Sequence, residues 1–335
     1  MHAPTFRLLA IAGGAALIAV TSAVVTANVG NAEPAKAAPL AGTVVMDNEQ
    51  SIEPNVAWFV AAPGVANRIT IRQLGFSTVE ITDRAGRIAA AVDCVSISAS
   101  TARCDAKEIK VYTDDGDDQV TARTEASKIS VFGGVGDDVL SAGSSTSTRI
   151  NGGLGDDVLT GGDSKDTVEG EDGADIIDGG GGNDALIGGR GADELSGGSG
   201  DDTIFGELMN VAGGESDYAS DRLDGGVGTD TADYSWSSEG VTVTLDGVAN
   251  DGIPGENDNV LTEHVRGSSK NDVLRGGNEG NRLEGKDGND KLYGMGGPDF
   301  LDAGFGAGEL TDGGSGIDLC RPIEADVTRV SCEAS

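Results

Sequence analysis

The sequence predicts an all-β fold: a parallel β-roll, which is a right-handed β-helix of nine-residue repeats, preceded by a small antiparallel β module. The main observation is a nine-residue period between Gly133 and Phe205. Glycines recur at its first, second and fourth positions, an aspartate at the sixth and an apolar residue at the eighth. Such a unit alternates a tight turn with a short strand, so successive units stack into a coil. The clear repeats start at Gly133, Gly152, Gly161, Gly170, Gly179, Gly188 and Gly197.

The turn half of the repeat depends on glycine. Glycine adopts backbone angles that are closed to residues with a Cβ, so six residues can turn tightly with carbonyl oxygens pointing outward. Two copies depart from the pattern, with Ser164 at a fourth position and Glu171 at a second position. The second- and fourth-position glycines expected at the metal sites are Gly134, Gly136, Gly153, Gly155, Gly180, Gly182, Gly189, Gly191, Gly198 and Gly200.

The sixth position adds a carboxylate to each turn. Carbonyl and carboxylate oxygens are hard ligands, and the repeats from Gly133 to Phe205 contain no histidine or cysteine. This ligand set suits Ca²⁺, which takes about 6 to 8 oxygens in flexible geometry, and it suits zinc poorly. The predicted calcium ligands of the first tract, residues 113–205, are Asp138, Asp157, Asp166, Asp175, Asp184, Asp193 and Asp202.

The strand half of the repeat has one inward position. A three-residue strand buries only its middle side chain, so two repeats make one flattened coil whose eighth residues meet inside. A flexible acidic linker would also be rich in glycine and aspartate, but it has no reason to keep an apolar residue at every eighth position. The eighth residues are Leu140, Leu159, Val168, Ile177, Leu186, Leu195 and Ile204.

These repeats resemble the RTX (repeat-in-toxin) nonapeptide, G-G-x-G-x-D-x-U-x, over residues 133–205. The resemblance implies that each Ca²⁺ lies between turns one coil apart, shared by aspartates 18 residues apart. The implied pairs are Asp157 with Asp175, Asp166 with Asp184, Asp175 with Asp193, and Asp184 with Asp202. In this scheme Asp138 and Asp157 are one residue out of register. The whole chain is also similar to calcium-binding repeat proteins secreted by actinobacteria, which implies a non-catalytic protein of the envelope or extracellular matrix.

The period breaks over residues 206–266 and returns in a weaker form over residues 267–319. The interruption contains one near-repeat with Asp230 in sixth place, and an acidic loop over residues 250–260 that either holds a further ion or is a solvated hairpin loop. In the second tract the expected ligands are Asp272, Asp290 and Asp299, of which only Asp272 and Asp290 form a good pair. Asp318 has no ligand-bearing neighbours in this scheme, so its removal is expected to matter little.

The ends of the chain point to export. Arg7 precedes a long apolar run and a small-residue stretch, which predicts a signal peptide and linker over residues 1–37, with an uncleaved membrane anchor as the alternative. The mature chain has no other spanning segment. Residues 40–112 alternate as β-strands do and form the predicted antiparallel module. Four cysteines allow three pairings, and their spacing favours Cys94–Cys104 and Cys320–Cys332, the second within a C-terminal cap of residues 320–335.

Charge restricts the partners. The formal net charge is -33, from 56 acidic and 23 basic residues, so nucleic acids and anionic membranes should be repelled. The expected partners are calcium ions and an unknown component of the cell surface or matrix. With so many carboxylates and so few inward side chains, the repeats need Ca²⁺ in order to fold.

The sequence gives little support for catalysis. Only His264 remains beyond the signal region, with Ser268 and Ser269 as possible partners. There is no G-x-S-x-G, H-E-x-x-H or phosphate-binding glycine motif. We therefore predict a secreted, non-enzymatic calcium-binding protein. Two alternatives stay open: an adhesin in which residues 40–112 bind a partner and the roll is a spacer, and a hydrolase of unrecognised type.

Overall fold

The computed structural model describes residues 43–46, 56–61, 64–86, 88–90, 94–125, 128–143, 146–207, 218–321 and 328–333. Every element of regular secondary structure in these ranges is a β-strand, which confirms the predicted all-β class. No helix in this part of the chain is long and apolar enough to cross a membrane. The predicted signal peptide, residues 1–37, lies outside the described residues.

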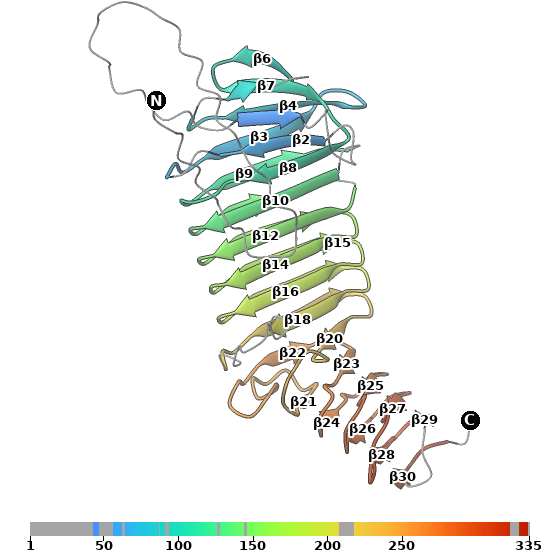
Figure 1. Ribbon diagram of the computed structural model, residues 1–335. Helices are drawn as coiled ribbons and strands as arrows, with labels where there is room; N and C mark the ends of the chain where they lie inside the picture. Colours follow the sequence, from blue (N-terminus) through green and yellow to red (C-terminus); the bar gives the residue numbers. More distant parts are fainter. Residues whose placement is uncertain are drawn as a thin grey trace, which may run out of the picture. The chain divides into compact units, whose positions relative to one another are not determined.

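Successive repeats send their strands alternately to two sheets. Strand β13 (Val158–Gly162) pairs in parallel with β15 (Ile176–Gly181), while β14 (Thr167–Asp172), between them in sequence, pairs with β16 (Ala185–Arg190) in the other sheet. Figure 1 shows β14 and β16 as successive rungs of one sheet. The architecture is therefore the predicted parallel β-roll.

Three sheets hold all the described strands. The 14-stranded sheet contains β1 (Thr43–Met46), β2 (Val56–Val60), β5 (Ala89–Ala90), β8 (Glu108–Tyr112), β10 (Lys128–Val135), β12 (Thr148–Leu154), β14, β16, β18 (Thr203–Glu207), β20 (Thr231–Asp233), β23 (His264–Arg266), β25 (Arg282–Glu284), β27 (Phe300–Asp302) and β29 (Leu319–Arg321). The 11-stranded sheet contains β3 (Arg68–Gln73), β4 (Thr78–Asp83), β6 (Cys94–Ser98), β7 (Thr101–Asp105), β9 (Gln119–Arg123), β11 (Val139–Ser141), β13, β15, β17 (Glu194–Ser199), β19 (Arg222–Val227) and β22 (Asn259–Leu261). The 5-stranded sheet contains β21 (Thr242–Thr244), β24 (Val273–Arg275), β26 (Lys291–Tyr293), β28 (Leu310–Asp312) and β30 (Thr328–Val330).

The eighth residue of each repeat points into the roll. Leu159 is in register with Ile177 in one sheet, and Ile150 with Val168 in the other. All seven eighth-position residues predicted from the sequence are buried. Burial of one such side chain stabilises the fold by about 1.5–3 kcal/mol. A core of one inward side chain per strand is thin. Its burial therefore leaves little stabilising free energy to offset the repulsion between acidic turns.

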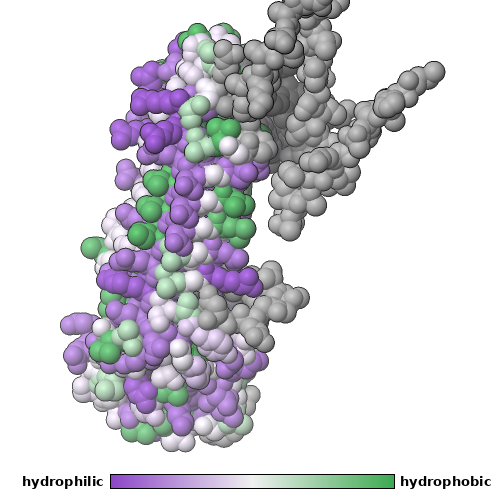
Figure 2. All heavy atoms as spheres, turned by 90° about the vertical axis from the view of Figure 1, so that its left-hand side faces the viewer, coloured by the Kyte–Doolittle hydropathy of each residue, from purple (hydrophilic) through white to green (hydrophobic). Residues whose placement is uncertain are grey.

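The third and seventh positions of the repeat face solvent. Figure 2 shows a largely hydrophilic face interrupted by apolar patches. The exposed aliphatic residues of the first tract occupy third and seventh positions: Val135, Val139, Leu154, Val158 and Ile176. The alternation of inward and outward side chains is thus the one that the nine-residue pattern predicts.

The N-terminal region, predicted as an antiparallel module, combines two kinds of pairing. Strand β4 pairs antiparallel with β3 and with β7, as expected. In addition, β2 pairs in parallel with β8 and β3 with β9, so parallel stacking begins well before the first clear nonapeptide. Strand β3 buries both Ile69 and Ile71. The core is therefore thicker here than in the repeats.

The stack changes within the predicted interruption. The 11-stranded sheet ends at β22, whereas the 14-stranded sheet continues through β20 and β23 to β29. The 5-stranded sheet starts at β21, and its later strands alternate along the chain with β25, β27 and β29. The second tract is therefore also a roll.

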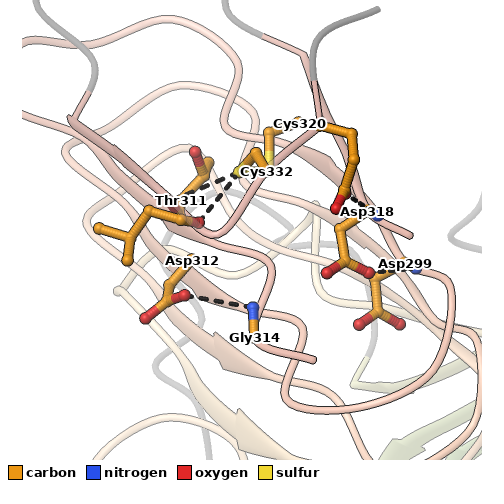
Figure 3. The surroundings of a disulfide bond; sticks show 9 residues. Asp299, Thr311, Asp312, Gly314, Asp318, Cys320 and Cys332 are labelled. Atoms are coloured by element: carbon orange, nitrogen blue, oxygen red, sulfur yellow. Dashed lines mark hydrogen bonds between the residues drawn. A yellow bond between two sulfur atoms is a disulfide. The ribbon is translucent and has the colours of Figure 1, made fainter. Parts of the chain in front are cut away.

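Both predicted disulfides are present. Cys94 on β6 is opposite Cys104 on β7, with 4.4 Å between their Cα atoms. Cys320 on β29 is bonded to Cys332, with 5.7 Å between the Cα atoms (Figure 3). Because Cys320 is buried in register with Leu301, this second bridge is anchored in the core of the last coil.

Candidate calcium site

The turns arrange carboxylates in rows along the edges of the roll. We call the turns before the strands of the 11-stranded sheet the first edge, those before the strands of the 14-stranded sheet the second edge, and those before the strands of the 5-stranded sheet the third edge. Every sixth-position aspartate predicted from the sequence is buried on one of them. The first edge holds Asp138, Asp157, Asp175 and Asp193; the second Asp166, Asp184, Asp202, Asp230 and Asp299; the third Asp272 and Asp290.

One repeated hydrogen bond joins adjacent turns. The main-chain N–H of Asp157 donates to Oδ1 of Asp175 at 2.8 Å, and that of Asp184 donates to Oδ1 of Asp202 at 2.7 Å. The same bond links Asp166 to Asp184 and Asp175 to Asp193. The structure thus brings together all four pairs that are 18 residues apart.

The pair Asp138 and Asp157 is also joined, contrary to the register difference expected from the sequence. The N–H of Asp138 donates to Oδ1 of Asp157 at 2.8 Å. The extra residue lies between β11 and β12, outside the turn that carries Asp138, because Val139 is in register with Val158 while Arg149 of the following strand is in register with Thr167. The turns that carry Asp138 and Asp157 therefore stay aligned, with Gly134 in register with Gly153.

Most of the predicted aspartates on the three edges have a second carboxylate oxygen, Oδ2, that accepts no hydrogen bond from the described residues. Within the part of the chain that the structure describes, Oδ2 of nine of them is buried and lacks a hydrogen-bond partner, which is rare for a buried polar atom. An oxygen left in this way calls for a cation or a proton. The nine are Asp138, Asp157, Asp166, Asp175, Asp184, Asp202, Asp230, Asp290 and Asp299.

The first glycine of each repeat leaves space beside this oxygen. A Cβ placed on Gly170 would overlap Oδ2 of Asp175 and lie 2.6 Å from the carbonyl oxygen of Gly188 on the next coil. On Gly179 it would lie 2.6 Å from Oδ2 of Asp184 and 2.7 Å from the carbonyl oxygen of Gly197. A small cradle lined by carboxylate and carbonyl oxygens therefore recurs along each edge, and a hard cation fits this donor set.

The second- and fourth-position glycines have the predicted backbone. All ten named from the sequence have positive φ, as illustrated by 95° at Gly180 and 125° at Gly182. Their Cα atoms also face carbonyl oxygens of the preceding coil, such as Gly162 O at Gly180, so a side chain would not fit. Glu171, which replaces one of these glycines, keeps a positive φ of 80°.

Burial raises the pKa of several carboxyls in the rows, because removal from water disfavours the charged form. It raises the pKa of Asp138 and Asp157 to about 7, and the pKa of Asp175 and Asp184 to about 6. Main-chain N–H donors oppose the shift, and neighbouring carboxylates add to it in most of these groups. On the third edge, burial raises the pKa of Asp290 to about 7. Without a cation, the charged rows are therefore unfavourable.

The sequence pattern missed further members of the first edge. Asp193 donates its N–H to Oδ1 of Asp221 at 2.9 Å, and Asp221 donates to Oδ1 of Asp258 at 3.0 Å. At the other end, Asp118, which is sixth in a degenerate repeat before Gly133, donates its N–H to Oδ1 of Asp138 at 2.8 Å. Each precedes a buried apolar residue by two positions, as Asp221 does Leu223. An aspartate two residues before an apolar residue is therefore still recognisable where the nine-residue period is lost.

Two residues of the second tract also differ from expectation. Asp318 is buried and accepts the N–H of Asp299 at 3.0 Å (Figure 3), so the expectation that it stands apart is wrong. Buried Glu309 precedes Thr311 of β28, which is in register with Leu292. A one-residue insertion therefore puts an acid in sixth place where the strict period finds Gly308.

The geometry restricts the chemistry of the rows. No three His, Cys, Asp or Glu side chains of the described residues are grouped so as to hold a metal ion among themselves. A site in these turns therefore has to combine few carboxylates with main-chain carbonyls, a mixture typical of Ca²⁺.

The hydroxyl of Ser268, named above as a possible partner of His264, donates instead to Asp272 at 2.8 Å.

Comparison with protein families agrees with this geometry. The family model for the RTX calcium-binding nonapeptide repeat, which spans four copies of the repeat, matches residues 130–147, 142–177, 151–186, 178–208 and 275–310. The chain carries RTX calcium-binding nonapeptide repeats. The ion of these RTX turns is Ca²⁺. No curated protein matches the chain.

Proposed function

We propose that this RTX-repeat chain is a secreted, non-catalytic calcium-binding protein of the cell envelope or extracellular matrix, whose roll folds when Ca²⁺ binds. The observation that carries the proposal is the recurrence of a buried, unpartnered Oδ2 beside a first-position glycine. Nine predicted aspartates share it among the described residues. A single such oxygen could be a local defect, whereas rows of them indicate a common ligand.

The protein's own groups prepare each site. A main-chain N–H of the preceding coil donates a hydrogen bond to Oδ1, as the N–H of Asp157 does to Asp175. Oδ2 of the same carboxylate therefore points toward the cradle. Positive-φ glycines such as Gly180 keep the turn narrow, and Gly170 leaves the space beside Asp175 Oδ2 open. Bound Ca²⁺ supplies the positive charge that offsets carboxylate repulsion and desolvation. The main ligands would be the sixth-position aspartates and the carbonyl oxygens of the turn glycines.

The expected energies are sufficient to couple binding to folding. Extracellular calcium sites bind at about 10⁻⁴ to 10⁻³ M, so about 1 mM Ca²⁺ stabilises the folded state by roughly 0.4 to 1.4 kcal/mol per site. Several sites together approach the whole stability of an ordinary domain, about 5 to 15 kcal/mol. Calcium would thus decide whether the tract is folded.

Secretion and absence of catalysis are supported indirectly. Two disulfides suit an oxidising compartment, and RTX repeats are typical of extracellular proteins. Ser268, one of the serines near His264, has both its N–H and its hydroxyl bonded to Asp272. Its hydroxyl is therefore committed to a structural role.

Calorimetric titration tests the proposal. The full chain, stripped of metal with chelator, should bind several Ca²⁺ per molecule, while Asp175→Asn should bind fewer. Hydrolysis of ester, peptide or glycoside substrates by the purified chain, or an absence of calcium heats, would contradict it.

A second candidate function, a binding module at the N-terminal end, has one specific observation in its favour. Acidic and basic residues balance up to Tyr112, so the whole net charge of -33 falls on the rest of the chain. This neutral region exposes Phe76, Val95 and Ile97. A pull-down with residues 40–112 should capture a partner equally with and without calcium if the roll is only a spacer.

A further inference from the structure

The unpartnered oxygen is missing from one stretch of the rows. Before the stretch, Oδ2 of Asp221 and of Asp230 is buried and has no donor among the described residues. After it, the same holds for Asp290 and Asp299. Between them, from Asp251 to Asn281, donors within the chain bond to the buried side chains of the Asp, Glu and Asn residues. We call this stretch the junction.

Asp258 is satisfied by a tyrosine. The hydroxyl of Tyr234 donates to Oδ2 of Asp258 at 2.9 Å, while the N–H of Asp221 donates to Oδ1 at 3.0 Å. Tyr234 and Asp258 are both buried, 8% and 1% exposed. The oxygen that is left unpartnered elsewhere therefore already has a donor here.

Asp272 and Asn281 are satisfied in a similar way. Ser268 donates its N–H to Oδ2 of Asp272 and its hydroxyl to Oδ1, each at 2.8 Å. At Asn281, the N–H of Gly277 donates to Oδ1 at 2.7 Å, and the amide donates to the carbonyl oxygen of Glu263 at 2.9 Å. Neither side chain presents an unpartnered oxygen.

The buried acidic loop of the junction follows the same rule. Both oxygens of Asp251 accept main-chain N–H groups, from Thr244 at 2.6 Å and from Val260 at 3.1 Å. Oε2 of Glu256 accepts the N–H of Ile253 at 2.7 Å. These hydrogen bonds hold the loop between β21 and β22 in one conformation.

We propose that Tyr234 and Ser268 divide the roll into two calcium tracts by supplying, at Asp258 and Asp272, the donors that replace an ion. The inference rests on the proposed calcium-dependent function. A buried oxygen without a donor is unfavourable. An ion removes this cost in the two tracts, whereas at the junction the chain's own donors have already removed it. Asp258, Asp272 and Asn281 accordingly hold no ion when both tracts are full.

Counting bound ions tests this. The full chain and its variants are dialysed against saturating Ca²⁺ and the metal per chain is measured by atomic emission. Asp258→Asn and Asp272→Asn should bind as many ions as the wild type, since Asn keeps an acceptor oxygen. The matched variants Asp175→Asn and Asp290→Asn, from the two tracts, should each lose at least one ion. A loss in Asp258→Asn or Asp272→Asn equal to that in Asp175→Asn overturns the proposal.

Tyr234→Phe provides the complementary test. It removes the hydroxyl and leaves Asp258 Oδ2 in the same state as in the tracts, so this variant should gain one ion per chain. An unchanged count with wild-type strand content by circular dichroism contradicts the role of Tyr234. A wild type that binds no calcium would instead refute the proposed function, so the two failures are distinguishable.

Discussion

The main-chain N–H of Asp193 donates to Oδ1 of Asp221 at 2.9 Å although 28 residues separate them. The same bond joins Asp202 to Asp230 on the second edge, again over 28 residues. The rows therefore continue past the point where the nine-residue period ends. Stacking of one turn on the next, rather than the sequence interval, determines which aspartates are neighbours.

Asp184 should be a sensitive position, because it bonds to both neighbours in its row. It accepts the N–H of Asp166 and donates to Asp202. Asp184→Ala should weaken two adjacent sites, by about 1–3 kcal/mol in total, and raise the calcium midpoint of folding measured by circular dichroism. Glu194→Ala removes an equal charge from the exposed surface of β17 and should leave the midpoint unchanged. Equal midpoints for the two variants would refute sharing between coils.

Gly170→Ala should abolish a site without removing a ligand. Its Cβ would fill the cradle between Asp175 Oδ2 and Gly188 O. Calorimetry should show a lower calcium stoichiometry and a higher folding midpoint. Gly143→Ala is the control, since among the described residues its Cβ would meet only Ala122 O, at 3.8 Å. If Gly170→Ala bound as many ions as this control, the cradle would not be the site.

Acid should partly replace calcium. Burial raises the pKa of Asp138, Asp157 and Asp290 to about 7, above the ordinary value of 3.8. The folded state therefore binds these protons more tightly than the unfolded chain. This stabilisation is complete below about pH 4 and is lost as pH rises through about 7.

In chelator, circular dichroism should accordingly show more β structure at pH 5 than at pH 8. Calorimetry should also show that the calcium concentration that half-saturates the folded chain rises as pH falls from 8 to 5, because protons compete for the same oxygens. A metal-free chain that gains structure with increasing pH would contradict the assignment.

The disulfides should pair locally. Non-reducing peptide mapping of secreted protein should recover Cys94 linked to Cys104 and Cys320 linked to Cys332, as in the structure. Reduction should increase hydrogen exchange in β29 and β30 first, since the second bridge closes the last coil. Peptides joining Cys94 to Cys320 would be inconsistent with this fold.

The fold could be predicted because period and polarity agree at every repeat. Glycine, aspartate and an apolar residue at fixed places determine turn, ligand and core together, as at Gly179, Asp184 and Leu186. The sequence could not show that parallel pairing starts at β2 and β3, because those strands lack the glycine turn.

The site was less predictable where residues are inserted. Asp221 was missed since an insertion hides its spacing from Asp193, and Glu309 since one extra residue moves it out of phase. The sequence also treated Asp272 as equivalent to Asp290. Only the structure shows that Ser268 satisfies both oxygens of Asp272.

The most direct test of calcium-coupled folding is hydrogen exchange of the full chain in chelator and in millimolar Ca²⁺, read by mass spectrometry over β11 to β19. We predict fast exchange of these strands in chelator and strong protection in Ca²⁺, with Mg²⁺ much less effective because it demands a tighter octahedron. Strands β3, β4 and β7, which have a thicker core and a disulfide, should stay protected in both conditions. Equal protection of β11 to β19 with and without Ca²⁺ would contradict the account.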